Sequence, residues 1–572
     1  MSLEQKIISV VMMRAKRVSE RYEQATWDPL EAQIRKLLSI ARKNKHTEYG
    51  KRYDFASIKT VSDFQRQVPV ITYEDIREDI ERVAAGEKNI LTAEEPIMFA
   101  RTSGTMGKPK YIIVTNTCRE REHSAIASTW GYHLLSAHPE IHKGVTVMLV
   151  STAIEGYTEG GIPYGSTSGS IYKNMPAIFR RKYAIPYDVF EISDYQGKYY
   201  AIMRLAMEQD ASVVSTANPS SILIMCEKGN EFAEEIIKDI HNGTLSNNFN
   251  IEPRIRKIIE KRIKPNRKRS SFLEKARSKR GGTLLPADYW PNLKLITCWK
   301  GGTVGHYIEK FPQWFNPDGD RDIPIRDWGY LSSEARCSIP ITDEGSAGIL
   351  AVATNFYEFV TVEDQMANPD DSSKWQYLTV DKLEDGREYY IFITTMGGLY
   401  RYDINDIIRV EGYHNNTPKI VFVRKGRDMT NMTGEKLSAD QVIIAARKAS
   451  RQTGVNPIFF KVEADIDMSR YILRIELFEN IPHVMARDYL RRFDENLKDI
   501  NIEYKAKRNS LRIADPVMHI MKKGWFENGQ KILAQNGNRV FQTKAKVLSP
   551  QKTDEKEVVP QLQEVIEECG VY

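Results

Sequence analysis

The chain has 572 residues, of which 41% are hydrophobic and 28% charged, and its formal net charge is +6. This length is too great for one hydrophobic core, so we expect a large globular protein of two or more domains. The small net charge implies little about anionic partners. The five scattered cysteines contain no Cys-x-x-Cys pair, which excludes a disulfide framework or a zinc site.

Residues 1–90 alternate amphipathic helical patterns with short polar joints. The apolar run at 7–13 is too short to span a membrane. The start of the chain shows neither a basic leader nor a small-residue cleavage site. We therefore expect a cytoplasmic protein with no membrane partner.

A loop rich in glycine and hydroxyl groups follows the apolar segment at 97–100. It reads Thr102-Ser103-Gly104-Thr105-Met106-Gly107-Lys108-Pro109-Lys110. Glycines let backbone N–H groups close on an anion, hydroxyls donate hydrogen bonds, and lysine supplies a charge. It is not a Walker A loop, because Gly104 and Gly107 are too close and proline follows the lysine. It predicts a phosphate-binding loop, with an ordinary Gly/Ser turn as the alternative.

Strand-like and helix-like patterns alternate after this loop. We expect helices at 118–135 and 195–209, and strands at 111–114, 145–150, 221–225, 294–298, 348–354 and 388–394. Such alternation predicts an α/β architecture with a substantially parallel sheet.

A basic segment lies between Arg254 and Arg280, with thirteen lysines or arginines and two glutamates. Apolar residues interleave it at roughly helical spacing: Ile255, Ile258, Ile259, Ile263 and Phe272. This pattern favours a solvated amphipathic face or a local anion site. No nucleic-acid-binding motif accompanies it, so we expect no nucleic-acid partner.

The sequence pattern changes near residue 424, where charge and glycine interrupt the apolar pattern. A helix at 439–450, strands at 459–463 and 471–477, and a helix at 484–500 predict a small α+β domain. We therefore place one domain at 1–423 and a second at 424–572. Residues 424–428 are the candidate hinge, with a static linker as the alternative.

Four later segments carry chemically useful groups. Residues 327–334 combine aromatic, hydroxyl and carboxylate side chains, which could stack a purine, hold a phosphate or ribose, and ligate a hard cation. Residues 356–359 alternate aromatic and acidic side chains, as expected where a strand edge passes a pocket. Residues 397–406 offer a carboxylate for ribose hydroxyls, and 431–436 place a lysine on a polar loop.

Each candidate has a structural alternative. Tyr330 could be core packing, Glu334 a surface acid, Asp406 a turn residue, and Lys436 a solvated lysine. The sequence alone leaves these alternatives open.

In their order and spacing, these motifs resemble the auxin-responsive acyl acid–amido synthetase family, within the superfamily of acyl-CoA synthetases, peptide-synthetase adenylation domains and luciferases. Residues 162–166 and 219–220 look like the family's bacterial branch. The resemblance covers essentially the whole chain. It implies an α/β fold with a large N-terminal adenylate-forming domain, in which helices flank mixed and parallel sheets, and a small mobile C-terminal α+β domain.

The resemblance also implies an enzyme that uses ATP and Mg²⁺ to adenylate a carboxylic acid. The acyl group then passes to an amine, which the resemblance implies is an amino acid, and the products are an amide, AMP and pyrophosphate. An acyl-CoA ligase and a non-catalytic nucleotide-binding relative are the alternatives. The identities of the acid and amine and the oligomeric state stay open.

Roles for individual residues follow from the same resemblance. The implied ATP-binding residues are Thr102, Ser103, Gly104, Thr105, Tyr330, Ser332, Ser333 and Asp406. Glu334 would hold magnesium, and the implied catalytic lysines are Lys108, Lys436 and Lys544. The implied substrate contacts are Tyr164, Tyr357 and Phe359.

The chain departs from the family pattern in the ribose segment. In the register that aligns Tyr402 and Asp406, Asp403 replaces an arginine and Asn405 replaces a glycine. Asparagine tolerates the left-handed backbone conformation that glycine usually supplies, so we expect the turn to survive.

Overall fold

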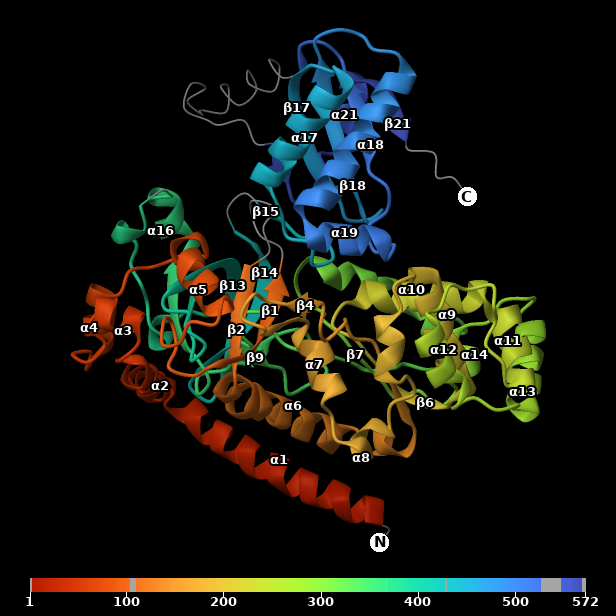
Figure 1. The fold of residues 1–572 in the computed structure, drawn as a ribbon, viewed down its shortest axis with the longest axis horizontal. Coiled ribbons are helices and arrows are strands. Elements are labelled where there is room, and N and C mark those ends of the chain that lie inside the picture. The colour runs from red at the N-terminus through yellow and green to blue at the C-terminus, as the bar shows by residue number, and fades with distance from the viewer. Residues whose placement is uncertain (1–2, 103–109, 370, 427–428, 526–546, 568–572) are drawn as a thin grey trace. The chain divides into compact units, whose positions relative to one another are not determined.

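The computed structural model describes residues 3–102, 110–369, 371–426, 429–525 and 547–567 (Figure 1). The chain divides into two compact units, one comprising Met1–Arg101 and Tyr111–Val423, the other Thr102–Lys110 and Arg424–Tyr572. The larger unit buries two extensive hydrophobic cores, and the smaller unit buries its own.

Helices connected by short polar joints open the larger unit, as the sequence predicts. They are α1 (Leu3–Trp27), α2 (Pro29–Asn44), α3 (Glu48–Arg52), α4 (Val61–Gln67) and α5 (Arg77–Ala84). Local chemistry starts them: Asp28 accepts a hydrogen bond from the Glu31 N–H, and Thr60 forms a capping box with Asp63. Helix α1 packs along α6 (Ser124–Ala137).

A four-stranded sheet carries the two ends of the predicted phosphate loop. Its order is β2-β1-β5-β4, and β1 and β5 are parallel. The strands are β1 (Pro96–Thr102), β2 (Lys110–Thr115), β4 (Gly156–Tyr157) and β5 (Pro163–Gly165). The loop joins β1 to β2.

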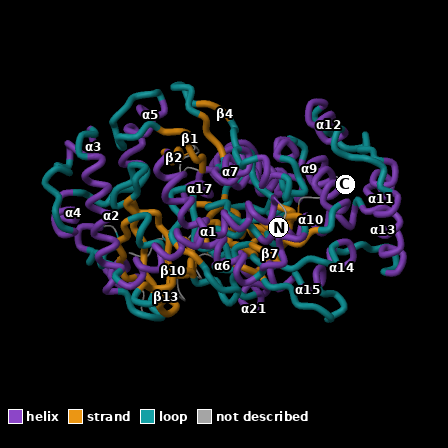
Figure 2. Tube along the Cα trace, turned by 90° about the horizontal axis from the view of Figure 1, so that it is seen from below, coloured by secondary structure: helices purple, strands orange, loops and turns teal. Residues whose placement is uncertain are grey.

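A second four-stranded sheet is entirely parallel, which confirms the α/β prediction. It contains β3 (Val145–Met148), β6 (Ala211–Ser215), β7 (Leu295–Thr297) and β8 (Ile325–Arg326). Helix α9 (Tyr195–Glu208) precedes β6 in the sequence and α10 (Pro219–Glu231) follows it. Figure 2 shows both helices in the right half of the picture.

The strand predicted at 221–225 is wrong, because these residues lie in α10. Asn218 caps the helix and Pro219 occupies its first turn. The run from Ile222 to Met225 is buried on every side, so its apolar pattern has no helical period to distinguish it from a buried strand.

A six-stranded sheet in the order β11-β12-β13-β14-β10-β9 completes the larger unit. Strand β12 pairs antiparallel with β11 and β13, and β10 pairs antiparallel with β14 and β9. The strands are β9 (Ser338–Ile339), β10 (Gly348–Leu350), β11 (Phe356–Thr361), β12 (Glu388–Thr394), β13 (Tyr402–His414) and β14 (Thr417–Lys425). This sheet carries part of the segment at 397–406 that the sequence predicts to bind ribose, because β13 begins at Tyr402.

The basic segment forms α12 (Pro253–Glu260) and α13 (Arg267–Lys279). Ile255, Ile259 and Ile263 are buried, as the amphipathic pattern predicts, whereas Phe272 is exposed. Arg256 and Arg269 each donate hydrogen bonds to three backbone carbonyls, so part of the positive charge is structural. No described helix of the chain is long and apolar enough to cross a bilayer.

The smaller unit has the helix–strand–strand–helix order that the sequence predicts. Its sheet runs β20-β17-β18-β19-β21, and a separate hairpin pairs β15 with β16. Helices α17 and α18 pack against each other. The described elements are β15 (Met429–Thr430), β16 (Leu437–Ser438), α17 (Ala439–Thr453), β17 (Pro457–Asp465), β18 (Arg470–Leu477), α18 (His483–Ile500), α19 (Ile502–Asn509), β19 (Val517–Met521), β20 (Leu548–Ser549), α21 (Glu555–Val558) and β21 (Leu562–Glu567).

Candidate functional site

Tyr330 and Asp406 meet inside the larger unit. The Tyr330 hydroxyl donates a hydrogen bond to Asp406 Oδ2 at 2.7 Å. The Tyr330 ring stacks on Phe422 of β14, with 5.8 Å between centroids and an interplanar angle of 19°. Burial, followed by the nearby Asp406 carboxylate, raises the pKa of Tyr330, which therefore stays a neutral donor.

A bulge presents Asp406 at this point of β13. Asp406 pairs with Ile391 of β12, whereas the next residue of β12, Phe392, pairs with Asp403. Asn405 lies within this irregularity with φ +56°, which confirms that it takes the left-handed conformation. Bulges of this kind re-aim side chains and recur beside active sites.

The segment before Tyr330 is held by a buried carboxylate. Asp327 follows β8 and accepts hydrogen bonds from the backbone N–H groups of Lys300 and Gly329. Burial raises the pKa of Asp327 to about 6 despite these donors. Gly329 has φ +84°, and a Cβ there would lie 2.4 Å from the Ser338 carbonyl oxygen. Only glycine fits this approach.

Residues 332–334 form a tight turn after Tyr330. Ser332 Oγ accepts hydrogen bonds from the N–H groups of Glu334 and Ala335, each at 3.2 Å. Ser333 and Glu334 are half-buried. The Glu334 carboxylate adds to burial in raising the pKa of Tyr402 and of Tyr330, so it lies near both phenols.

Glu334 is a suitable oxygen donor for Mg²⁺. The described residues contain no group of three or more His, Cys, Asp or Glu side chains that could hold a metal alone. A single carboxylate fits Mg²⁺, which usually shares its coordination between one or two protein carboxylates, water and substrate phosphates.

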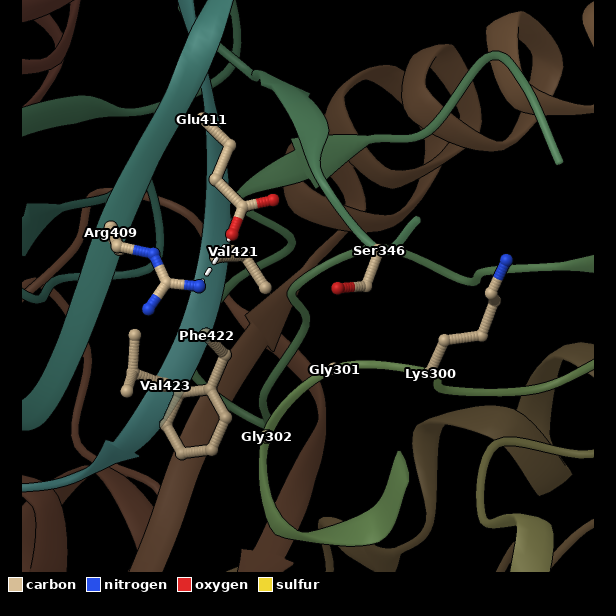
Figure 3. A pocket seen from close by; sticks show the side chains of 9 residues that line it. All are labelled: Lys300, Gly301, Gly302, Ser346, Arg409, Glu411, Val421, Phe422 and Val423. Atoms are coloured by element: carbon tan, nitrogen blue, oxygen red, sulfur yellow. Dashed lines mark hydrogen bonds and ion pairs between the residues drawn. The ribbon is translucent and has the colours of Figure 1, made fainter. Parts of the chain in front are cut away.

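A cavity of about 390 Å³ is lined by Phe422, the stacking partner of Tyr330 (Figure 3). Arg409 and Glu411 pair at 2.6 Å on one side, and the Gly301–Gly302 backbone lies across from them. Its lining residues are Lys300, Gly301, Gly302, Ser346, Arg409, Glu411, Val421, Phe422 and Val423. The volume falls within the range of small-molecule sites.

None of the motifs in the sequence pointed to this cavity. Gly302 has φ +65°, and a Cβ there would lie 2.8 Å from the Phe422 ring. The sequence signal for a cavity here is the Gly301-Gly302 pair, which follows the parallel strand β7. Ligands of α/β proteins commonly bind at this end of a parallel strand. Phe422 has no local signal, because only tertiary packing brings it to Tyr330.

The predicted substrate contacts lie in different surroundings. Tyr164 of β5 is half-buried. The centroid of its ring lies 5.3 Å from the centroid of the Tyr111 ring and 5.3 Å from the guanidinium carbon of Arg101. Tyr357 and Phe359 of β11 are fully buried in the core. Their contact with substrate stays a prediction.

Glu358, between these two aromatic residues, forms a buried ion pair with Arg401 at 2.9 Å. Arg401 also donates to the Gln65 and Val68 carbonyls. The acidic residue of this segment therefore serves the fold.

Lys436 lies in the smaller unit, on the loop between β15 and β16, with φ +47°. Glu435 organises the loop by accepting hydrogen bonds from the N–H groups of Met432 and Thr433 and from the Tyr471 hydroxyl. Asn501 donates to the Glu435 carbonyl at 2.9 Å. This network fixes the backbone that carries Lys436.

The structure describes little or nothing of the remaining predicted residues. Only the backbone of Thr102 is described, as the last residue of β1. Five predicted residues lie outside the described ranges: Ser103, Gly104, Thr105, Lys108 and Lys544.

Comparison with known proteins decides the family. The sequence matches the GH3 family N-terminal domain over residues 18–319, the central domain over 348–425 and the C-terminal domain over 439–553. The chain belongs to the GH3 family. The resemblance found in the motifs is thereby confirmed, while the bacterial relationship within the GH3 family stays a prediction.

Curated GH3 relatives match most of the chain. An indole-3-acetic acid-amido synthetase of Arabidopsis thaliana, GH3.2, is 26% identical over 75% of this chain and 80% of its own length. A jasmonoyl–L-amino acid synthetase of Nicotiana attenuata, JAR6, is 23% identical over 89% of each chain. The solved structure of the acyl acid amido synthetase GH3.15 in complex with 2,4-DB matches with a TM-score of 0.64, 20% identity and 98% coverage of both chains. This likeness confirms the predicted fold.

Proposed function

We propose that this GH3 protein is an ATP-dependent acyl acid–amido synthetase. It adenylates a small carboxylic acid and transfers the acyl group to the amine of an amino acid, yielding an amide, AMP and pyrophosphate. Family membership supports the class of reaction, since its relatives include an indole-3-acetic acid-amido synthetase and a jasmonoyl–L-amino acid synthetase. The observation that carries the site is the Tyr330–Asp406 pair beside the Phe422 stack and its cavity.

Different residues bind the adenine, the ribose and the phosphates of ATP. Tyr330 and Phe422 supply an aromatic wall for adenine, and the Asp406 carboxylate accepts hydrogen bonds from the ribose hydroxyls. Ser333 faces the α-phosphate, and residues 102–105 with Lys108 bind the phosphate chain. Phe422 also lines the neighbouring cavity of about 390 Å³.

Adenylation overcomes the low reactivity of a carboxylate. Hydroxide is a poor leaving group, whereas AMP is a good one. Glu334 would hold Mg²⁺, which when bound would screen the repulsion between carboxylate and triphosphate. Lys108 and Lys436 place positive charge where negative charge develops as pyrophosphate leaves. Lys544 is the third catalytic lysine that the family resemblance implies.

Product analysis tests this function. The protein is incubated with ATP, Mg²⁺, a carboxylic acid and either an amino-acid mixture or coenzyme A, and the products are identified by mass spectrometry. We expect an acyl–amino acid amide and AMP. Exclusive thioester formation would establish the acyl-CoA ligase alternative instead.

A further inference from the structure

The segment from Arg254 to Arg280 concentrates positive charge that the proposed function does not use. It contains thirteen lysines or arginines and two glutamates, whereas the formal net charge of the whole chain is only +6. The rest of the chain is therefore net negative. Figures 1 and 2 both show the helices of this segment, α12 and α13, on the right side of the larger unit. This side of the unit carries a local field that attracts anions.

The basic side chains of the segment fall into two groups. Five are bound within the protein, through ion pairs or hydrogen bonds to backbone carbonyls: Arg254, Arg256, Arg269, Arg277 and Arg280. The other eight are exposed, and none makes a side-chain hydrogen bond or an ion pair with any residue that the structure describes. These eight residues form the basic surface: Lys257, Lys261, Arg262, Lys264, Arg267, Lys268, Lys275 and Lys279.

One face of α13 presents three of these lysines in a stripe. Lys268, Lys275 and Lys279 are separated by seven and then four residues, and Phe272 lies four residues after the first. Residues at such spacings share one face of a helix. Glu274, the acidic residue of α13, is at neither spacing and lies outside the stripe. The solvent-facing side of α13 therefore carries charge of a single sign.

Phe272 places an exposed aromatic ring among these lysines. It is 41% exposed, and the guanidinium carbon of Arg269 lies 5.0 Å from its ring centroid. Arg269 is itself fixed by hydrogen bonds to the backbone carbonyls of Met207, Gln209 and Tyr289. The ring is therefore supported at the surface by a group that the fold holds in place. Aromatic rings flanked by lysines suit the boundary between lipid headgroups and acyl chains.

We propose that the basic surface binds an anionic lipid bilayer, with Phe272 entering the headgroup region. Lysine clusters on a helix attract acidic headgroups, and each lysine close to the bilayer strengthens binding. Attachment of this kind requires no spanning helix. The proposal therefore replaces the expectation of no membrane partner, which rested on the lack of a spanning segment and a leader. It does not depend on the chemistry of the ATP site.

Two features favour a bilayer over a nucleic acid. Six of the eight residues of the basic surface are lysines, whereas arginine is the preferred residue for recognition of nucleic acids. Phe272 is the only aromatic residue between positions 254 and 280, whereas proteins that bind single strands stack successive bases on several aromatic side chains. A bilayer requires only diffuse positive charge and one apolar anchor.

Co-sedimentation of the full-length protein with vesicles tests the proposal. One set of vesicles is pure phosphatidylcholine, and the other contains equal parts of phosphatidylcholine and phosphatidylserine. We expect the wild type to bind the anionic vesicles alone, and binding to weaken as salt screens the charges. The triple variant Lys268→Gln/Lys275→Gln/Lys279→Gln should lower the partition coefficient by about thirtyfold to a hundredfold. Phe272→Ser should lower it by about threefold to tenfold.

The triple variant Lys51→Gln/Lys59→Gln/Lys88→Gln is the matched control, because it removes the same charge from three exposed lysines. They lie between α3 and the residues just after α5, and both Figures 1 and 2 show α3 and α5 on the left side of the larger unit. The control should bind like the wild type. An equal loss in the control would mean that net charge alone attracts the protein, which would overturn the proposal.

The charge-retaining variant Lys268→Arg/Lys275→Arg/Lys279→Arg should bind like the wild type. A loss of binding in this variant would contradict an electrostatic role. Circular dichroism and thermal unfolding establish that each variant folds. Folding is expected because the three lysines make no hydrogen bond or ion pair with a described residue.

Three further results would overturn the proposal. Equal binding of the wild type to both kinds of vesicle would exclude recognition of anionic lipid. Binding to a duplex DNA or RNA oligonucleotide, lost in the glutamine variant of α13, without binding to vesicles would assign the basic surface to nucleic acid. Binding to neither vesicles nor oligonucleotides would leave the basic surface a solvated face of the fold.

Discussion

Asp406 Oδ2 accepts a hydrogen bond from the Tyr330 hydroxyl at 2.7 Å, although the two residues are 76 positions apart. The bond connects the turn that carries Ser333 and Glu334 to the bulge in β13. It brings the predicted adenine, ribose and metal residues into one region of the larger unit.

Asp406→Asn should weaken ATP binding by about tenfold to a hundredfold, because hydrogen bonds to charged groups are each worth about 1.5–3 kcal/mol. Tyr330→Phe, which removes only the hydroxyl, should cause a smaller loss. Isothermal calorimetry with ATP measures both variants. Unchanged ATP affinity in a folded Asp406→Asn protein would remove Asp406 from the ribose site.

Lys108→Ala and Glu334→Ala should each slow ATP–pyrophosphate exchange by about a hundredfold, since a preorganised charge on a transferring phosphate is typically worth ~3 kcal/mol. Lys88→Ala is the control, because Lys88 lies in an exposed ion pair with Glu95. If both variants fold and exchange at near-normal rates, the phosphate and metal assignments are misplaced.

Lys436→Ala should slow exchange severely and leave transfer from a supplied acyl-adenylate nearly intact. This result is expected if the smaller unit rotates between the two half-reactions and Lys436 serves only the first. Lys448→Ala, an exposed lysine of α17 in the same unit, is the control. Equal damage to both steps would mean that Lys436 acts in a single arrangement or supports the fold.

Lys507 should make the stability of the smaller unit depend on pH. Burial, followed by the charge of Arg512, lowers its pKa to about 7, against about 10.4 in an unfolded chain. Between these values the unfolded state binds more protons, so the free energy of unfolding should rise with pH from about 7 to 10. Lys507→Met should flatten this rise in urea titrations. An unchanged slope would contradict the lowered pKa.

The sequence predicted features that depend on local chemistry. The helix–strand–strand–helix order after residue 439 follows from clear periodicity, and the left-handed conformation of Asn405 follows from its replacement of a glycine. The segments at 327–334 and 397–406, which contain Tyr330 and Asp406, helped to identify the family because their order and spacing are retained.

Other features depend on tertiary packing. The run at 222–225 is apolar on all sides, so its pattern could not distinguish strand from helix. Phe422 has no motif of its own, because its stacking partner Tyr330 comes from a segment distant in sequence. This contact exists only in the folded protein.

Acid-dependent ATP–pyrophosphate exchange tests the central claim most directly, because it detects reversible adenylation without requiring the amine. With labelled pyrophosphate, ATP, Mg²⁺ and a panel of carboxylic acids, we predict label entering ATP only when a suitable acid is present. Binding of ATP without exchange for any acid would contradict the proposed synthetase and favour a non-catalytic nucleotide-binding protein.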